Sequence, residues 1–467
     1  MKTRPHPKQV EAIKAPLKRN ICVLAGPGSG KTRVIVERMM YLQAEGITPE
    51  SIRLVTFTNA AKNEAKSRFK SEDKNRLAES CTTTHGLCRE VLFETEGNEH
   101  YGWQSIGAKK QKKWFVQKLK EKVPSARKHV DLTLRIYSYC EHYGLDVRKE
   151  LLKQKSLHRF VTKIMPVIRD YESYKAKNKL LDNTEQLVLA AKSLKKKRFA
   201  KKCARRVKYL FVDEAQDLCK HKWSIVKSLE KQGSKIFCVG DPAQAIMGFS
   251  GAEVEKFIKF EGMFYDARTI KLVNNYRSTS PLVEFSNHLR NQMSSAYNLL
   301  ESDISGDKSI IRESDKLGES AAWVARDIKR QIDEGTQPSD IAILVHANKD
   351  KEIIKQQLKN CGVPVPKRVR HGKKRKKKIR LGVSIGTVHK SKGKEWQQVY
   401  VLDPRLKFHP QMGLIELQCW WYVAISRAVS RLVCCLSKNA GYMYSGSKRK
   451  QKHFMDDIPS ALYDFIT

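Results

Sequence analysis

The chain has 467 residues, enough for two to four domains, and it carries 90 Lys and Arg against 49 Asp and Glu, a formal net charge of +41. This excess favours a polyanionic partner such as nucleic acid. The sequence has no apolar run of membrane-spanning length and starts with a polar stretch unlike a secretion signal, so we expect neither a membrane nor an exported protein. Eleven scattered cysteines without a Cys-x-x-Cys pair fit a reducing compartment and argue against zinc or cysteine-ligated iron–sulfur sites. We expect an intracellular protein, in cytoplasm or nucleoid, or in the nucleus of a eukaryote.

The first element in chain order is a strand that runs into a glycine-rich loop and then a helix. The apolar run 20–24 is followed by Ala25-Gly26-Pro27-Gly28-Ser29-Gly30-Lys31-Thr32. In such a loop, backbone N–H groups and the amino end of the helix surround a phosphate. Lys31 is then placed to reach β- and γ-phosphate oxygens, and the Thr32 hydroxyl to hold Mg²⁺. Ala25 departs from the strict pattern, which has Gly there, but the flanking strand and helix favour a nucleotide site over a chance turn.

A later apolar run, 207–212, ends in the acidic pair Asp213-Glu214. A buried parallel strand delivers such side chains to the carboxyl edge of its sheet. We expect Asp213 to hold Mg²⁺, directly or through water, and Glu214 to orient and deprotonate the attacking water. A solvated acidic pair is the common alternative at a strand end. The phosphate loop at 25–32 favours catalysis, so the two motifs together predict nucleotide hydrolysis.

Strand-like and helix-like segments alternate in two parts of the chain, which predicts two α/β domains with parallel sheets. The strands expected in the first part are 21–24, 52–57, 209–212 and 236–239. Those expected in the second part are 341–345, 383–388, 399–402 and 432–436. Residues 96–205 are rich in Lys and have few strand signals, so we expect a helical insertion in the first domain.

Basic residues gather in three runs, at 109–113, 192–208 and, most densely, 367–380. Blocks of like charge are usually solvated segments, and the last run also resembles a nuclear localisation signal. Its density favours contact with nucleic acid over simple solvation.

The remaining motifs follow one another in an order that resembles UvrD/Rep/PcrA-type superfamily 1 helicases over most of residues 5–287 and 340–436. Besides the phosphate loop and Asp213-Glu214, the segments that carry the resemblance are His6–Gln9, Val55–Ala61, Thr83–Leu87, Val239–Ala252, Asn275–Thr279, Thr387–Trp396 and Tyr422–Ala428. A single motif of this kind would be weak, but the whole set in the right order is very specific.

The resemblance implies an α/β fold class with two RecA-like parallel-sheet P-loop motor domains and a helical insertion in the first. The expected boundaries are 1–95 and 206–272 for the first motor domain, 96–205 for the insertion and 273–467 for the second motor domain. The family usually inserts a large helical subdomain after the position of Val365. Here only the basic loop 367–380 lies before Val383.

The resemblance also implies roles at the nucleotide. Arg277 and Arg427 would be arginine fingers from the second domain, and Gln244 would sense the γ-phosphate. The residues expected to line the nucleotide are Gln9 at the adenine edge, Tyr276 stacked on adenine, Glu395 at the ribose, Arg33 beside the phosphates, and residues 25–32 of the loop. The alternative for each arginine is an ordinary surface salt bridge without a role at the nucleotide.

For single-stranded DNA the resemblance implies two stacking side chains, Phe57 and Phe249, for which core packing is the alternative. The polar contacts it implies are Thr56, Asn59, His85, Thr387 and His389. Met247, Phe249 and Ser250 stand where the family commonly has Tyr, Trp and Arg, and His346 where it often has Arg. These departures predict weaker stacking and coupling.

The leading hypothesis is an ATP-dependent single-strand DNA translocase and helicase, moving 3′ to 5′, in replication, repair or recombination. It would use ATP and Mg²⁺ and act on single-stranded and tailed duplex DNA as a monomer or transient oligomer. Two alternatives stay open: a nucleic-acid-stimulated ATPase switch, and an RNA helicase, because stacking and phosphate contacts discriminate poorly between strands.

Overall fold

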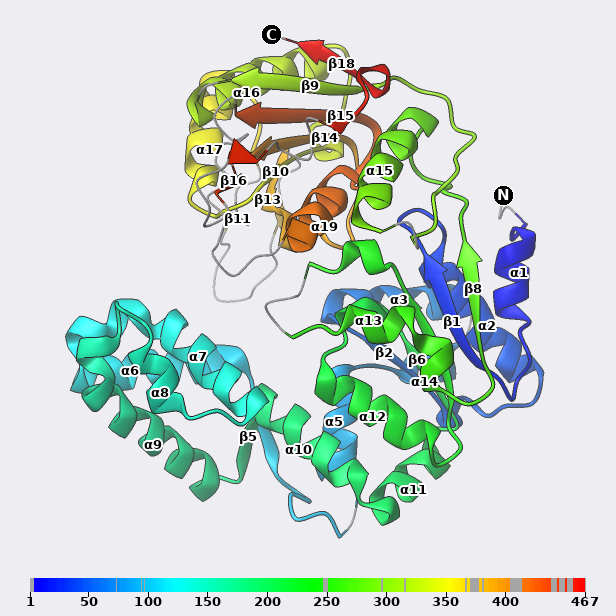
Figure 1. Cartoon of the computed structure of the whole chain (residues 1–467), viewed down its shortest axis with the longest axis vertical. Coiled ribbons are helices and arrows are strands. Elements are labelled where there is room, and N and C mark those ends of the chain that lie inside the picture. Colours follow the sequence, from blue (N-terminus) through cyan, green and yellow to red (C-terminus); the bar gives the residue numbers. More distant parts are fainter. Residues whose placement is uncertain are drawn as a thin grey trace.

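In the computed structural model the chain forms two α/β domains, and a helical arm projects from the first (Figure 1). The structure describes residues 4–72, 74–93, 95, 97–246, 251–294, 297–314, 316–365, 368–369, 378–379, 382–403, 414–437, 443–444, 450–451 and 457–466. In these ranges no helix combines the length and apolar character needed to cross a membrane.

The first domain is built on a six-stranded parallel sheet with the strand order β3-β2-β6-β7-β1-β8. Its strands are β1 (Asn20–Ala25), β2 (Ile52–Thr56), β3 (Cys81–Thr83), β6 (Tyr209–Val212), β7 (Lys235–Gly240) and β8 (Ala267–Leu272). The inner strands are buried on both faces, as parallel strands covered by helices should be. Because all strands run the same way, the loops after β1, β6 and β7 meet at one edge of the sheet.

Helices cover both faces of this sheet and build two cores. The helices are α1 (Pro7–Ile13), α2 (Lys31–Ala44), α3 (Asn59–Ser71), α4 (Asn75–Glu79), α5 (Thr84–Phe93), α10 (Asn183–Lys195), α11 (Lys197–Arg206), α12 (Lys220–Glu230), α13 (Val254–Ile258) and α14 (Phe260–Met263). The core on one face includes Val34 and Leu54, and the core on the other includes Leu187, Trp223 and Leu229.

The helical arm is α6 (Ala108–Lys122), α7 (Val130–Tyr143), α8 (Val147–Leu152) and α9 (Val161–Lys177), tied at its base by the short parallel pair β4 (Gln104–Ile106) and β5 (Leu180–Asp182). It has a separate core that includes Phe115, Tyr137 and Tyr171. Within the predicted insertion 96–205, α10 and α11 bury residues in a core of the first domain, and α10 also contacts α7 of the arm. Figure 1 shows the arm standing away from both sheets.

The second domain has its own six-stranded parallel sheet, in the order β13-β10-β14-β15-β9-β18. Its strands are β9 (Ser309–Ser314), β10 (Ile341–Val345), β13 (Ser384–Thr387), β14 (Trp396–Asp403), β15 (Ala428–Ser437) and β18 (Tyr463–Ile466). Its helices are α15 (Ser280–Met293), α16 (Leu317–Asp333), α17 (Asp350–Asn360), α18 (Val388–Ser391) and α19 (Leu414–Ile425). The fold class is therefore α/β with two parallel sheets, as predicted.

The predicted basic loop 367–380 lies mostly outside the described residues. Within it the backbone of β11 (Arg368–Val369) pairs antiparallel with β12 (Lys378–Ile379). A second two-residue ladder joins β16 (Met443–Tyr444) to β17 (Lys450–Gln451).

Candidate active site between the two domains

The phosphate loop leaves the carboxyl end of β1 and turns into α2. Gly28 and Gly30 have φ values of +74° and +82°, which a side chain would strain. The Lys31 ammonium folds back over the loop and donates hydrogen bonds to the carbonyls of Ala25 (3.1 Å) and Gly26 (2.9 Å). Burial lowers the pKa of Lys31, although the nearby Glu214, Asp241 and Asp213 carboxylates oppose the shift. The loop, the lysine and the carboxylates therefore lie close together at the carboxyl edge of the sheet.

The acidic pair occupies the turn after β6. Glu214 has a left-handed backbone, φ +54°, a conformation that costs a side-chain-bearing residue about 1–3 kcal/mol and collects at functional sites. Burial alone would raise the pKa of Glu214, but the charges of Lys392 and Lys31 outweigh burial. The pKa of Glu214 is therefore lowered, and the carboxylate is ionised. Burial and the Glu214 charge raise the pKa of Asp213 to about 7. Glu214 is thus ready to accept a proton, and a cation bound beside Asp213 would keep the Asp213 carboxylate ionised.

The second domain delivers two cations to these carboxylates. Lys392, just after α18, lies 2.6 Å from Asp217 and 3.6 Å from Glu214, and it also donates to the carbonyl of Gln244 at 3.0 Å. Arg427, between α19 and β15, donates from Nη2 to Oε1 of Gln244 at 3.1 Å. Burial lowers the pKa of Arg427 to about 10, so it stays charged at neutral pH. The predicted finger and the predicted sensor are therefore in direct contact across the domain boundary.

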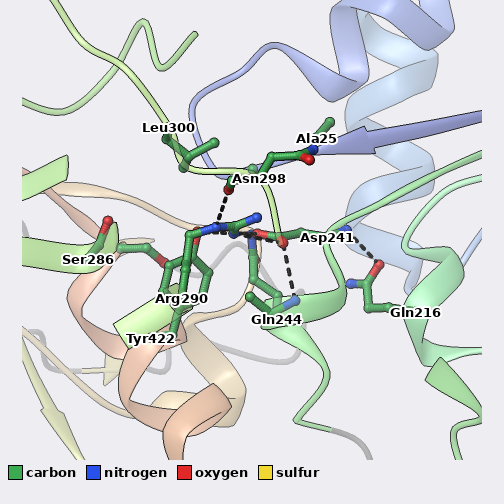
Figure 2. A network of polar contacts seen from close by, with 12 residues as sticks. Ala25, Gln216, Asp241, Gln244, Ser286, Arg290, Asn298, Leu300 and Tyr422 are labelled. Carbon is green, nitrogen blue, oxygen red and sulfur yellow. Dashed lines mark hydrogen bonds and ion pairs between the residues drawn. The ribbon is translucent and has the colours of Figure 1, made fainter. Parts of the chain in front are cut away.

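A buried ion pair lies behind this contact (Figure 2). Arg290 of α15 in the second domain holds Asp241, which follows β7 in the first domain, at 2.9 and 3.0 Å. The side chains are 2% and 0% exposed. Arg290 also donates to the Tyr422 hydroxyl at 2.6 Å and to the carbonyl of Asn298 at 2.7 Å. Because Nε and Nη1 of Arg290 donate to four acceptors, including both oxygens of Asp241, the charge is compensated inside the protein.

Asp241 connects that ion pair to the Glu214 carboxylate. Its Oδ2 accepts a hydrogen bond from Nε2 of Gln244 at 2.9 Å, and its backbone N–H donates to Oε1 of Gln216 at 3.1 Å. Gln216 in turn donates to the Glu214 carboxylate. A continuous hydrogen-bonded chain therefore runs from Arg290 in the second domain to Glu214 in the first.

The start of the second domain lies directly on the phosphate loop. The Tyr276 N–H donates to the carbonyl of Gly28 at 3.0 Å. A Cβ added to Gly28 would lie 2.3 Å from Oδ1 of Asn275, and one added to Gly26 would lie 2.6 Å from Leu300. These two glycines are needed here because the second domain approaches the loop too closely for any side chain.

The residues predicted at the base and ribose lie around the same loop. The Tyr276 ring is 51% exposed, which leaves its face free for stacking. Gln9 is buried and donates from Nε2 to the carbonyl of Ser29 at 2.9 Å. Arg33 pairs with Glu37 at 2.6 Å.

The second predicted finger, Arg277, forms an ion pair with Glu395 at 3.0 Å and also donates to the carbonyl of Ser426. Its Nε is buried without a hydrogen-bond partner. A buried donor of this kind is costly, so it marks where an anionic group would be stabilised.

The donor set fits a nucleotide with Mg²⁺. Thr32 lies in the first turn of α2 and Asp213 at the end of β6, both hard oxygen ligands at the carboxyl edge of the sheet. Among the described residues no group of three or more His, Cys, Asp or Glu could hold a metal by itself. This arrangement suits Mg²⁺, which is commonly held by one or two protein ligands together with phosphate oxygens.

Known proteins agree with this architecture. Residues 6–265 match the UvrD/REP helicase N-terminal domain, and residues 270–369 and 382–434 each match a UvrD-like helicase C-terminal domain. The first match alone covers more than half of the 467 residues. This chain belongs to the UvrD/REP helicase family.

Similar UvrD/REP-type proteins come from fungi and bacteria. The chain is 30% identical over 378 residues to the ATP-dependent DNA helicase srs2 of Schizosaccharomyces pombe, covering 73% of this chain and 41% of that protein. It is 29% identical over 358 residues to a probable DNA helicase II homolog of Mycoplasma capricolum, covering 73% and 49%. It is 26% identical over 370 residues to the ATP-dependent DNA helicase PcrA of Staphylococcus epidermidis, covering 76% and 50%. The chain thus spans half or less of the length of these relatives.

The residues that the UvrD/REP resemblance assigns to DNA in the first domain differ in accessibility. Phe57 is half-buried, and the ammonium of Lys222 lies 4.4 Å from the centre of its ring. Asn59 is exposed at the start of α3. His85 is half-buried in α5, where burial and Lys222 lower its pKa and keep it neutral. Thr56 is 1% exposed, and its hydroxyl donates to backbone carbonyls, so a direct contact with DNA would have to replace those bonds.

In the second domain Thr387 is buried, 7% exposed, and His389 is half-buried, with a pKa lowered by burial and His346. His346 lies against Trp420, with ring centres 5.5 Å apart. Phe249 lies outside the described residues, as do Met247 and Ser250, so the predicted stacking at this motif stays a prediction.

Sequence reasoning missed several residues of this UvrD/REP-type site. Lys392 stands inside the recognised segment 387–396 but received no role, and Asp217 is five residues after the β6 strand end. The helical position of Arg290 gives no local signal, because a lone arginine in an amphipathic helix is normally a surface residue.

Proposed function

We propose that the chain is an ATP-dependent DNA helicase and single-strand DNA translocase that moves 3′ to 5′. The observation that carries the proposal is the contact of Lys392 of the second domain with Glu214 and Asp217 of the first, together with the contact of Arg427 with Gln244. Hydrolysis would then proceed only when the two domains are together, and this dependence is what a motor requires.

In the proposed reaction Glu214 orients a water molecule and accepts its proton as that water attacks the γ-phosphate. The lowered pKa of Glu214 supports this role, because the base must be ionised before the reaction. Thr32 and Asp213 would hold Mg²⁺, which neutralises phosphate charge when bound. Lys31, Arg277 and Arg427 would stabilise charge that develops on the phosphate oxygens.

The remaining nucleotide contacts are those that the UvrD/REP resemblance implies. Residues Ala25, Gly26, Pro27, Gly28, Ser29, Gly30 and Thr32 would surround the phosphates, with Arg33 beside them. Tyr276 and Gln9 would hold adenine, Glu395 the ribose, and Gln244 would report the γ-phosphate to the second domain. The hydrogen bond from Arg427 to Gln244 supports this last role.

Single-stranded DNA would lie across both domains, on Phe57, Asn59 and His85 of the first and Thr387 and His389 of the second, with Phe249 as a further stacking residue. Contacts on both domains would favour the closed state and so stimulate hydrolysis. We place the activity in replication, repair or recombination, in an intracellular compartment, with the chain acting as a monomer or transient oligomer on single-stranded and tailed duplex DNA. The named activities of the srs2 and PcrA relatives support this assignment.

A strand-displacement assay tests the proposal directly. Duplexes with a 3′ tail, a 5′ tail or blunt ends are offered as DNA and as RNA, with ATP and Mg²⁺, and Glu214→Gln protein is the control. We expect unwinding of the 3′-tailed DNA alone, lost in the variant. Preference for RNA would support the RNA helicase alternative, and stimulated hydrolysis without displacement would support the switch.

A further inference from the structure

We propose that α11 and its flanking residues form a docking surface for duplex DNA that is separate from the cleft between the two domains. The surface, here named the basic ridge, is residues 192–208. It takes DNA as its partner from the proposed function, but it shares no residue with the nucleotide site or with the predicted strand contacts. Its exposed cations are Lys192, Lys195, Lys196, Lys197, Arg198, Lys201, Lys202, Arg205, Arg206 and Lys208.

The ridge is a fixed surface because its helix is packed into the first domain. Phe199, Ala200, Cys203 and Ala204 of α11 are 2–8% exposed, and Ala200, Cys203 and Ala204 lie in the same core as Trp223. The apolar side of the helix therefore faces inward, and the cations at the intervening positions face solvent. At 1.5 Å per residue the stretch from 197 to 205 holds cations along about 12 Å of a rigid element.

Residues 192–208 themselves include no Asp or Glu. The arm helices, by contrast, carry acidic residues among their lysines, and Lys112 of α6 pairs with Asp131 of α7 at 2.6 Å. The carboxylate of Glu90, which influences Cys203, is held by Arg53 at 3.1 Å. Like charges four residues apart on a helix repel one another, and a bound polyanion relieves that repulsion.

The composition of the ridge favours a duplex over a single strand. Sequence-independent grip on single strands uses exposed aromatic rings for stacking, and the one aromatic residue between 192 and 208, Phe199, is 5% exposed. A duplex can be bound through its phosphate backbone alone, and that backbone presents about one negative charge per 1.7 Å of helix axis. A straight row of cations on a rigid helix suits that regular charge.

The position of the ridge shows what a second contact with DNA, outside the cleft between the domains, would do. Lys208 immediately precedes the amino end of β6, whereas the phosphate loop follows the carboxyl end of β1. The ridge therefore lies at the opposite edge of the sheet from the nucleotide site. Figure 1 shows α11 on the side of the first domain that is turned away from the second domain. A duplex held there belongs to one domain only and stays attached while the domains move relative to each other.

The test is nucleotide-free binding of a blunt DNA duplex at several salt concentrations, using the full chain. The ridge variant replaces four cations by glutamine: Lys197→Gln, Arg198→Gln, Lys201→Gln and Arg205→Gln. The matched control removes the same charge from exposed lysines of α6: Lys109→Gln, Lys110→Gln, Lys113→Gln and Lys120→Gln. Each lost phosphate contact flattens log K against log salt by about 0.9, so we expect the ridge variant to be shallower by about 3 to 4 and roughly tenfold or more weaker at low salt.

Affinity for an oligo-dT strand and ATPase activity at saturating oligo-dT should stay within about twofold in the ridge variant, because neither uses these residues. An unchanged duplex slope, an equal loss in the α6 control or an equal loss for oligo-dT would each overturn the ridge. The ridge would also be overturned if the ridge variant kept its binding to duplex DNA but lost its binding to anionic phospholipid vesicles. A wild-type ATPase that ignores oligo-dT would instead count against the proposed function, while the duplex slopes would still decide the ridge.

Discussion

Replacing Arg290 by methionine would leave the Asp241 carboxylate buried without its cation. The pair is 2% and 0% exposed, with contacts of 2.9 and 3.0 Å, so water cannot take over the role of the guanidinium. Removing one partner of such a buried pair costs about 3–5 kcal/mol. Since Arg290 and Asp241 belong to different domains, the loss should fall on the contact between them, and one cooperative unfolding transition should separate into two.

Urea unfolding of the nucleotide-free chain, followed by circular dichroism and calorimetry, measures this cost. Arg19→Met is the matched control: Arg19 pairs with Asp266 at 2.8 Å, but the side chains are 37% and 42% exposed, so at most about 1 kcal/mol is expected. Adding Asp241→Asn to Arg290→Met removes the stranded charge and should recover at least about 1 kcal/mol. A single-variant cost under about 1 kcal/mol, or no recovery in the double variant, would refute the reasoning.

Four further outcomes follow from the site. Glu214→Gln should bind ATP but lose turnover, since only water activation is removed, and normal turnover in a steady-state assay would contradict the assigned base. Lys31→Ala should lose nucleotide affinity and rate together, as measured by nucleotide titration and turnover. Arg427→Ala should bind ATP yet hydrolyse it roughly 10³-fold more slowly, and a fall below tenfold would make this arginine structural. Because burial raises the Asp213 pKa to about 7, the folded state binds more protons than the unfolded state between about pH 4 and 7, so metal-free stability should fall as pH rises through that window, and Asp213→Asn should weaken the dependence in urea titrations.

The sequence predicted β1, β2, β6 and β7 of the first sheet and β10, β13, β14 and β15 of the second, but it missed β3, β8, β9 and β18. Strands such as β6 and β10 are continuous apolar runs, and the structure places them at 209–212 and 341–345 as expected. The strands β3, β8 and β18 lie at sheet edges, and β9 lies beside β18. An edge strand is covered less completely, so its sequence alternates or is short, and β8 has the burial pattern of that kind. A continuous apolar run therefore indicates that a strand lies at the centre of a sheet, and not only that a strand forms.

The site was predictable where chemistry imposes a local pattern. A phosphate loop needs glycines and a lysine at fixed spacing, so residues 25–32 were readable from the chain alone. Two contacts across the domain boundary were not, because Leu300 reaches the loop and Arg290 reaches Asp241 only through the packing of the two domains. Such contacts join residues far apart in sequence and leave no periodic trace. The same holds for the division of 96–205 between the arm and the first domain, since α10 and α11 are amphipathic helices that either core could have buried.

The segment that connects the two domains also contacts the phosphate loop, because the Tyr276 N–H donates a hydrogen bond to the carbonyl of Gly28. With Leu300 and Asn275 against Gly26 and Gly28, this connection forms part of the wall around the phosphate loop. A first domain produced alone would therefore have an incomplete wall and hold nucleotide weakly. In the whole chain, movement of the second domain away from the first would also open this wall, so separation of the domains and release of a bound nucleotide would be linked.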